Sequence, residues 1–310
     1  MLRGLFSPRG DRQPGWLAIA LQAGALHYAH GIGGEPGACA IRRCGTERLA
    51  DDRQLERVAK ELGFDRHQCL ALLPPADYQM LFVEAPNVPA LELKTAVRWR
   101  IKDMLDYHVQ DATIDVLDIP PESAGPGRAH SMYAVAARNE VIQACIARFD
   151  GARIPLTVID IPETAQRNIA VLLEPPERGV ALVYVDRAQS LLTVTFRGEL
   201  HLARRIDIGL DSLERASSDD LNRLLLELQR SFDHLERQFP AAAPGKLVLA
   251  PMPSENHLHR HLSRNLDIPV EELHLDEVLN LDRSLALERG TAWRLFHVLG
   301  AALRYEPKAL

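Results

Sequence analysis

The feature that most constrains the fold of this chain is a pattern of three short apolar runs that occurs twice. The runs of the first copy span residues 16–21, 25–31 and 38–43. Those of the second copy span residues 180–185, 191–196 and 200–206. Short apolar runs between turns that contain glycine or aspartate are typical of antiparallel strands. The chain is therefore predicted to form two three-stranded meanders.

The segments after each meander predict an alternation of helices and strands. After the first meander we expect a helix over 51–62, strands over 69–73 and 154–159, and a helix over 162–173. After the second we expect helices over 219–239, 254–266 and 291–304, with strands over 246–250 and 270–273. Leucines and phenylalanines recur in steps of mostly three and four from Leu221 to Phe239, which is the spacing of an amphipathic helix.

Residues 76–150 differ from this repeat and are expected to form a small α+β insert. Its elements are predicted as a strand over 78–84, a helix from Pro89 to about Tyr107, strands over 114–119 and 131–137, and a helix over 139–149. Two similar α/β units, each opened by a meander, indicate a duplicated α/β fold. We accordingly expect a first half over residues 1–173, which contains the insert, and a second half over residues 174–310.

Composition narrows the classes of function. The chain has 310 residues, 46% of them hydrophobic, and a formal net charge of −6. A negative net charge argues against nucleic-acid binding, which generally needs a basic face. Four cysteines are too few for a disulfide scaffold, so we expect a reduced, cytoplasmic setting. The start of the chain lacks the apolar region of a secretory signal, and no apolar run approaches the ~20 residues of a membrane-spanning helix.

The order of the repeated elements resembles the actin-like ATPase superfamily, in which the hairpin that opens each half holds nucleotide phosphate. Four stretches are similar to the PilM-type proteins of type IV pilus assembly and to the MshI-like proteins of mannose-sensitive haemagglutinin (MSHA) pilus biogenesis, and the departures from the PilM nucleotide motifs described below favour the MshI-like proteins. The four stretches cover residues 1–6 with 15–20, 93–104, 227–234 with 246–250, and 299–304. The resemblance implies a two-lobed actin-like (ribonuclease H-like) fold.

The resemblance also implies where a nucleotide would be held. The corresponding remnant in this chain comprises Gln22, Gly24, Asp186, Arg187, Gln189 and Ser190. The first turn lacks the carboxylate that would hold Mg²⁺ through water. The second turn keeps Asp186 but has Arg187 where a glycine is expected, and a bulky side chain there hinders close approach of the backbone N–H groups to phosphate.

A third phosphate contact is expected at the turn after the strand over 246–250. This turn reads Ala-Pro-Met-Pro-Ser, and proline has no N–H group to donate. Three incomplete contacts predict a pseudo-ATPase with no catalytic residues and no cofactor. The alternative is a PilM-like ATPase that binds ATP with Mg²⁺.

Two other motifs favour ordinary surface roles. His257 and His261 would share one face of a helix, but no glutamate and no third ligand accompany them, so a solvated face is expected rather than a metal site. The basic run over 98–102 is expected to form a surface of the insert, with a partner or anionic lipid as the alternative contact.

The partner is implied by the resemblance alone. PilM-type proteins dock the cytoplasmic tail of a single-pass inner-membrane pilus assembly protein in a groove of the first half. We therefore expect this chain to reach the inner membrane through such a partner. The equivalent component of a type II secretion-like system is an alternative, and a homodimer is left open.

Overall fold

The computed structural model describes residues 13–33, 38–119, 130–214, 218–254 and 257–305. The stretches 1–12 and 34–37 lie outside the described residues, and so do 120–129, 215–217, 255–256 and 306–310. The similar N-terminal stretch over residues 1–6 therefore has no structural account. Within the described part, no helix is long and apolar enough to cross a membrane.

The first sheet contains the first meander and has further strands on both sides of it. Its strands are β1 (Trp16–Gln22), β2 (Ala25–Ile32), β3 (Ala40–Arg48), β4 (Gln68–Leu72) and β8 (Leu156–Asp160), with a short β14 (Asn280–Leu281). The order is β14-β3-β2-β1-β4-β8, in which β1, β2 and β3 are antiparallel and β4 and β8 continue in parallel. The predicted meander and the predicted return of the 154–159 strand to this sheet are confirmed.

The second sheet repeats the same order. Its strands are β9 (Gly179–Val185), β10 (Ser190–Phe196), β11 (Glu199–Ile206), β12 (Pro244–Leu249) and β13 (Val270–Glu272), in the order β11-β10-β9-β12-β13. Three antiparallel strands are again followed by two parallel ones. The duplicated α/β fold that the repeated runs predict is therefore present.

The insert forms a third sheet with its own core. Strands β5 (Tyr78–Glu84), β7 (Ser131–Arg138) and β6 (Ala112–Ile119) are antiparallel, and α2 (Ala90–Ile101) packs on them through Val97 and Ile101. The prediction that this helix continues to about Tyr107 is wrong. Asp103 and Asp106 follow Ile101, and negative side chains are unfavourable at the C-terminus of a helix.

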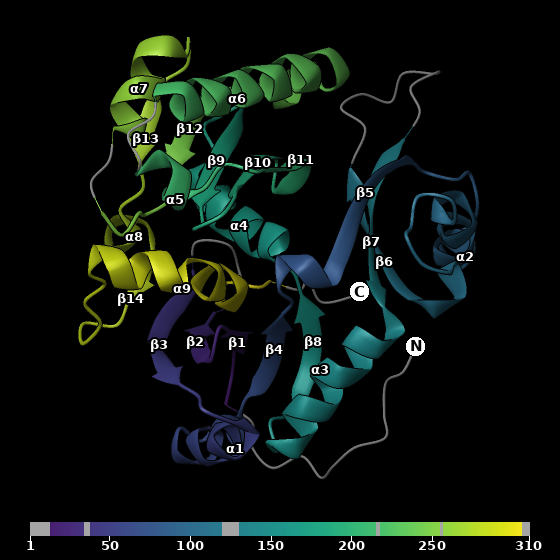
Figure 1. The fold of residues 1–310 in the computed structure, drawn as a ribbon, viewed down its shortest axis with the longest axis vertical. Coiled ribbons are helices and arrows are strands. Elements are labelled where there is room, and N and C mark those ends of the chain that lie inside the picture. Colours follow the sequence, from purple (N-terminus) through teal and green to yellow (C-terminus); the bar gives the residue numbers. More distant parts are fainter. Residues whose placement is uncertain (1–12, 34–37, 120–129, 215–217, 255–256, 306–310) are drawn as a thin grey trace.

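The remaining helices form layers around and between the sheets (Figure 1). They are α1 (Asp52–Glu61), α3 (Asn139–Gly151), α4 (Pro162–Ala170), α5 (Leu210–Leu213), α6 (Ser218–Gln238), α7 (Leu258–Asn265), α8 (Leu275–Val278) and α9 (Arg289–Ala302). Single 3₁₀ turns occupy Phe64–Arg66, Pro75–Asp77, Val109–Asp111, Val171–Leu173 and Pro240–Ala242. Helices α4 and α9 lie between the first and second sheets, whereas α6 and α7 cover the outer face of the second sheet.

The alternation of side chains along β1 explains these layers. Leu17 and Ile19 pack in one core with residues of α1 and α3, whereas the small Ala18 and Ala20 share the opposite core with α9. Small side chains on one face allow a helix to approach closely. Gly300 likewise allows α9 to lie close to α4, because a Cβ there would lie 2.2 Å from the carbonyl oxygen of Ala165 in α4.

The chain crosses between the two lobes near its C-terminal end. The first lobe is the first sheet with α1, α3 and the insert, and the second lobe is the second sheet with α6 and α7. Strand β14 pairs in parallel with Ala40 and Ile41 of β3, so residues after 174 add a strand to the first sheet. This strand has only two residues, and no pattern in the sequence predicts it.

Candidate functional site

The turns that open the two meanders meet at one small cavity between the lobes. Gln22 at the end of β1 lines it from the first lobe, and Asp186 and Gln189 line it from the second. The other three residues of the predicted nucleotide remnant do not line this cavity. Its volume is about 50 Å³, whereas small-molecule pockets generally enclose ~300–1,000 Å³.

The first turn is a tight two-residue connection. Gln22 pairs with Ala25, and Ala23 and Gly24 both have positive φ angles, of 46° and 72°. This is the type I′ geometry that suits the twist of a hairpin. The carbonyl oxygen of Gly24 accepts a hydrogen bond from the backbone N–H of Leu49, at 2.7 Å. Gly24 therefore permits the tight turn, and its carbonyl oxygen holds the segment after β3 against the hairpin.

The backbone of the second turn is largely occupied by bonds within the protein. The N–H of Asp186 donates to the carbonyl oxygen of Gln189, and the N–H of Arg187 donates to Oδ1 of Asp186, both at 2.8 Å. The carbonyl oxygens of Asp186 and Arg187 accept from the N–H groups of Leu210 and Asp211. Two of the N–H groups that could cradle a phosphate are thus already paired.

Arg187 and Ser190 have structural contacts outside the cavity. The guanidinium of Arg187 lies 3.5 Å from the carboxylate of Asp211 and is largely exposed. Ser190 is fully buried, and its hydroxyl donates to the carbonyl oxygen of Ile208 at 2.6 Å. That bond fixes the segment 207–209 against the second hairpin.

Aromatic side chains of β9 and α9 pack against one another beside this cavity. Tyr184 stacks on Phe296, with ring centroids 5.2 Å apart, and its hydroxyl donates to the carbonyl oxygen of Trp293. His297 packs edge-on to Tyr184 at 4.4 Å and lines the cavity. Burial, with a smaller contribution from the positive charge of Arg205, lowers the pKa of His297 to about 3. This histidine is therefore neutral at physiological pH.

A buried network ties the two lobes together beside this cavity. Glu163 of α4 is 2% exposed and accepts hydrogen bonds from the hydroxyl of Tyr78 in β5 and from the guanidinium of Arg205 in β11. The closest Arg205–Glu163 distance is 2.5 Å. Arg205 also donates to the Tyr78 hydroxyl. We call Tyr78, Glu163 and Arg205 the latch, because they join the insert, the inter-lobe helix and the second sheet.

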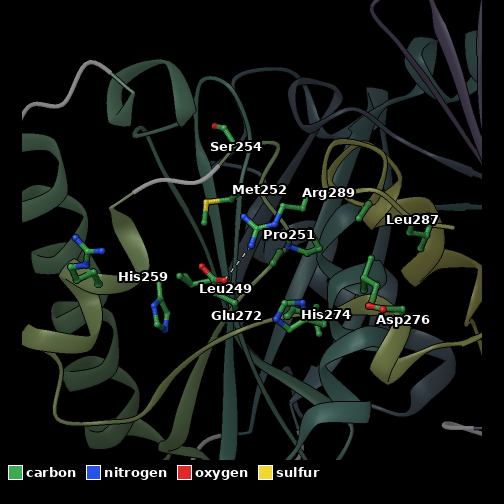
Figure 2. Close-up of a pocket in the computed structure, with 15 residues that line it drawn as sticks. Leu249, Pro251, Met252, Ser254, His259, Glu272, His274, Asp276, Leu287 and Arg289 are labelled. Carbon is green, nitrogen blue, oxygen red and sulfur yellow. Dashed lines mark ion pairs between the residues drawn. The ribbon is translucent and has the colours of Figure 1, made fainter.

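The third predicted phosphate contact lies at a separate cavity of about 250 Å³ in the second lobe. Pro251, Met252 and Ser254 of the turn after β12 line it (Figure 2). Arg289 and Glu272 lie on its wall as an ion pair at 3.8 Å. The structure thus brings together the first two predicted contacts but places the third at a different cavity.

His259, which lies between the two histidines of the predicted motif, contributes to this same wall. The His259 ring lies 3.1 Å from the carbonyl oxygen of Val270, and His274 is nearby (Figure 2). His257 precedes α7, which begins at Leu258 rather than at 254 as predicted, and His261 lies one turn into the helix. Within the described ranges, no three His, Cys, Asp or Glu side chains are grouped as a metal site would require.

An apolar groove of about 250 Å³ opens on the first lobe between the ends of β1 and β4 and helix α3. Its walls include Leu21, Leu73, Val141, Ala144 and Cys145. Phe149 is the only fully buried residue of α3, so most of this helix remains accessible. Cys145 is only partly buried, because it lines this groove.

Sequence reasoning missed both the latch and this groove. Glu163 follows Pro162 in the first turn of α4, where an acidic residue is common for electrostatic reasons and signals no distant partner. Arg205 lies 42 residues from Glu163 and 127 from Tyr78. Nothing in the local spacing of these residues could have paired them.

A comparison with solved structures supports this fold. A solved structure described as a PilM–PilN type IV pilus biogenesis complex superposes with a TM-score of 0.72 at 19% identity, covering 97% of this chain and 100% of that one. The chain has a two-lobed actin-like fold. No protein-family profile matches the chain, and a search of curated proteins finds no match.

Two further solved structures are similar at lower TM-scores. The cytoplasmic domain of EpsL, an inner-membrane component of the Vibrio cholerae type II secretion system, has a TM-score of 0.49 at 13% identity, with 94% of this chain and 96% of that chain covered. A Bacteroides thetaiotaomicron protein of unknown function, described as having an actin-like ATPase fold, has a TM-score of 0.49 at 10% identity, with 86% and 92% covered.

Proposed function

We propose that this chain is a cytoplasmic component of a type IV pilus assembly machine that docks the cytoplasmic tail of a single-pass inner-membrane protein. The observation that carries the proposal is the apolar groove beside α3. It belongs to the first lobe, and side chains of an extended peptide could fill it. The full-length likeness to a chain of the PilM–PilN complex supports a role of the same kind. The departures of the turns at Gln22 and Arg187 from the PilM nucleotide motifs favour an MSHA-type pilus.

The proposed role does not depend on a nucleotide. The cavity between the lobes has a volume of about 50 Å³, and Asp186 and Arg187 already use their N–H groups within the protein. The first turn presents Gln22 rather than a carboxylate. These features support a pseudo-ATPase that acts as a scaffold and is held at the inner membrane by its partner.

A second candidate function is an ATP-binding, PilM-like component. The cavity lined by Pro251 and Met252 favours it, because its volume of about 250 Å³ exceeds that of the cavity between the hairpins. ATP with Mg²⁺ would then have to span two separate cavities. The corresponding component of a type II secretion-like system would use the same groove with a different membrane partner.

The docking groove can be tested with one pair of matched variants. Ala144 lines the groove, whereas Ala147 lies on the same helix, is also exposed and does not line it. Ala144→Trp places a large ring at the groove, and Ala147→Trp adds the same ring beside it. The probes are the cytoplasmic tails of the single-pass inner-membrane proteins encoded beside this chain's gene, each fused to a fluorescent carrier.

We expect one tail to bind, and we expect Ala144→Trp to weaken that binding at least tenfold while Ala147→Trp leaves it within twofold. Fluorescence anisotropy measures the affinity, and circular dichroism melts show whether both variants are folded. Absence of binding by every tail would contradict the proposal. Equal binding by Ala144→Trp and the unmodified chain would place the tail elsewhere on the surface.

A further inference from the structure

Another open cavity lies at the end of the first sheet that is opposite the turn after β1. It has a volume of about 470 Å³ and lies between the end of β2, the start of β3 and the C-terminal end of α1. Trp16 at the start of β1 pairs with Gly31 near the end of β2. The seven residues of β1 therefore separate this cavity from the turn after Gln22 by ~20 Å.

The walls of this cavity are strongly basic although the chain as a whole is acidic. Four cationic side chains line it against a single carboxylate, that of Glu61. The cations are those of Arg42, Arg43, Lys60 and Arg66. Glu61 is itself paired with Arg57 at 3.8 Å. The net positive charge of the wall is therefore opposite in sign to the chain's formal charge of −6.

Two of these cations form no ion pair with any residue that the structure describes, although the Glu61 carboxylate lies on the same wall. Lys60 and Arg66 are exposed, and neither forms an ion pair with another described side chain. Arg42 has only a distant partner, because its guanidinium lies 3.8 Å from the exposed carboxylate of Asp282. Cations grouped without counter-charges repel one another, and a bound anion would relieve that repulsion.

His67, a buried histidine on the same wall, has a ring nitrogen without a hydrogen-bond partner among the described residues. Arg43 donates one hydrogen bond to the carbonyl oxygen of Leu62 at 2.6 Å and another to Nε2 of His67 at 2.9 Å. A guanidinium can only donate, so Nε2 of His67 accepts and the ring proton is on Nδ1. His67 is 2% exposed, and its Nδ1 has no partner within the described part of the chain.

We propose that this cavity is a binding site for a phosphate group, held by Lys60, Arg66 and the Arg43–His67 pair. A phosphate accepts several hydrogen bonds and carries the charge that this wall lacks, and arginine matches its geometry. The volume of the cavity leaves room for an organic group beyond the phosphate, as in a soluble phosphate ester or a phospholipid headgroup. Burial, with smaller contributions from the neighbouring His30 and Arg43, lowers the pKa of His67 to about 4 although Asp65 acts in the opposite direction, and a bound anion would raise it.

The variant that tests this site is Lys60→Ala with Arg66→Ala, because both residues are exposed and their loss should leave the fold intact. The matched control is Arg53→Ala with Arg264→Ala, which removes the same charge from exposed positions outside the cavity. The soluble probes are inorganic phosphate and glycerol 3-phosphate in a chloride buffer, measured by calorimetry. The membrane probes are phosphatidylglycerol and phosphatidylcholine vesicles, measured by flotation.

We expect saturable binding of at least one phosphate probe, reduced at least tenfold in the Lys60/Arg66 variant and unchanged within twofold in the control. The imidazole signals of His67 should shift during the titration, whereas those of His274 should not. Binding of glycerol 3-phosphate alone identifies a soluble ligand, and flotation with phosphatidylglycerol alone identifies a headgroup. No binding of any probe, or equal losses in both double variants, would overturn the proposal.

Discussion

The inter-lobe cavity and the groove beside α3 are neighbours that differ in volume and in the elements that line them. Leu72 and Leu73 at the end of β4 line both. On one side lies a space of about 50 Å³ bordered by charged and aromatic side chains, and on the other an apolar groove of about 250 Å³. The groove is built from the first sheet, the 3₁₀ turn after β4 and α3, all of the first lobe, whereas the cavity is lined by both lobes. A ligand could therefore enter the groove without any separation of the lobes.

The latch explains why the two regions differ. Glu163 is buried and receives hydrogen bonds from the first lobe, through Tyr78, and from the second lobe, through Arg205. To open the cavity, the lobes would have to break these bonds and leave a carboxylate without partners. Breaking a buried pair in this way is costly. The comparison predicts a rigid inter-lobe region beside an accessible groove.

The largest expected effect is on the latch itself. Arg205→Ala removes the cation and leaves Glu163 buried without its charged partner, so we expect the free energy of unfolding to fall by about 3–5 kcal/mol. Urea unfolding followed by circular dichroism measures this loss. The control is Arg187→Ala, whose ion pair with Asp211 is largely exposed and should contribute ~0–1 kcal/mol. Similar losses in the two variants would mean that the latch is not a structural tie.

A smaller effect on the free energy of unfolding is expected from His297, which lines the inter-lobe cavity. The pKa of His297 is about 3 in the folded chain, against 6.5 for its ordinary value. Below pH 6.5 the unfolded chain binds a proton that folded His297 does not. The free energy of unfolding should therefore decrease as the pH is lowered from 6.5 to 3, by at most about 1.4 kcal/mol per pH unit.

The substitution His297→Gln should flatten this pH dependence, because glutamine has no proton to gain. Urea unfolding at pH 7, 5.5 and 4.5 measures the slope. His67 also has a lowered pKa, so part of the slope should remain. His274→Gln changes an exposed histidine and is the matched control. A slope that is the same in His297→Gln as in the unmodified chain would show that water reaches this side chain freely.

The smallest expected effect is that of a nucleotide. A ligand at one hundred times its dissociation constant raises stability by ~2.7 kcal/mol, but we expect Mg-ATP to leave the melting temperature within the scatter of replicate melts. Arg187→Gly should behave identically, because the N–H groups of Asp186 and Arg187 remain paired. Micromolar ATP affinity by calorimetry, in either protein, would favour the ATP-binding alternative.

Local patterns were enough to predict most of the fold. The six apolar runs form β1, β2, β3, β9, β10 and β11. They could be predicted because hydrophobic alternation and turn residues depend only on residues that are close in the sequence. The long amphipathic stripe became α6 for the same reason. The two hairpin turns were also located correctly, and Gln22, Asp186 and Gln189, which the resemblance placed in a nucleotide cleft, line one cavity; whether that cavity holds a nucleotide stays a prediction.

The repeated α/β elements and the residues at the two turns could be predicted from the chain alone, because each depends on side chains within a few positions. What surrounds those turns depends on contacts between segments that are far apart in the chain. The latch joins residues 42 to 127 positions apart, and the two-residue β14 has no stabilising partner until β3 is in place. The groove and the basic cavity likewise exist only where separate elements meet, since their walls come from segments that carry no common pattern.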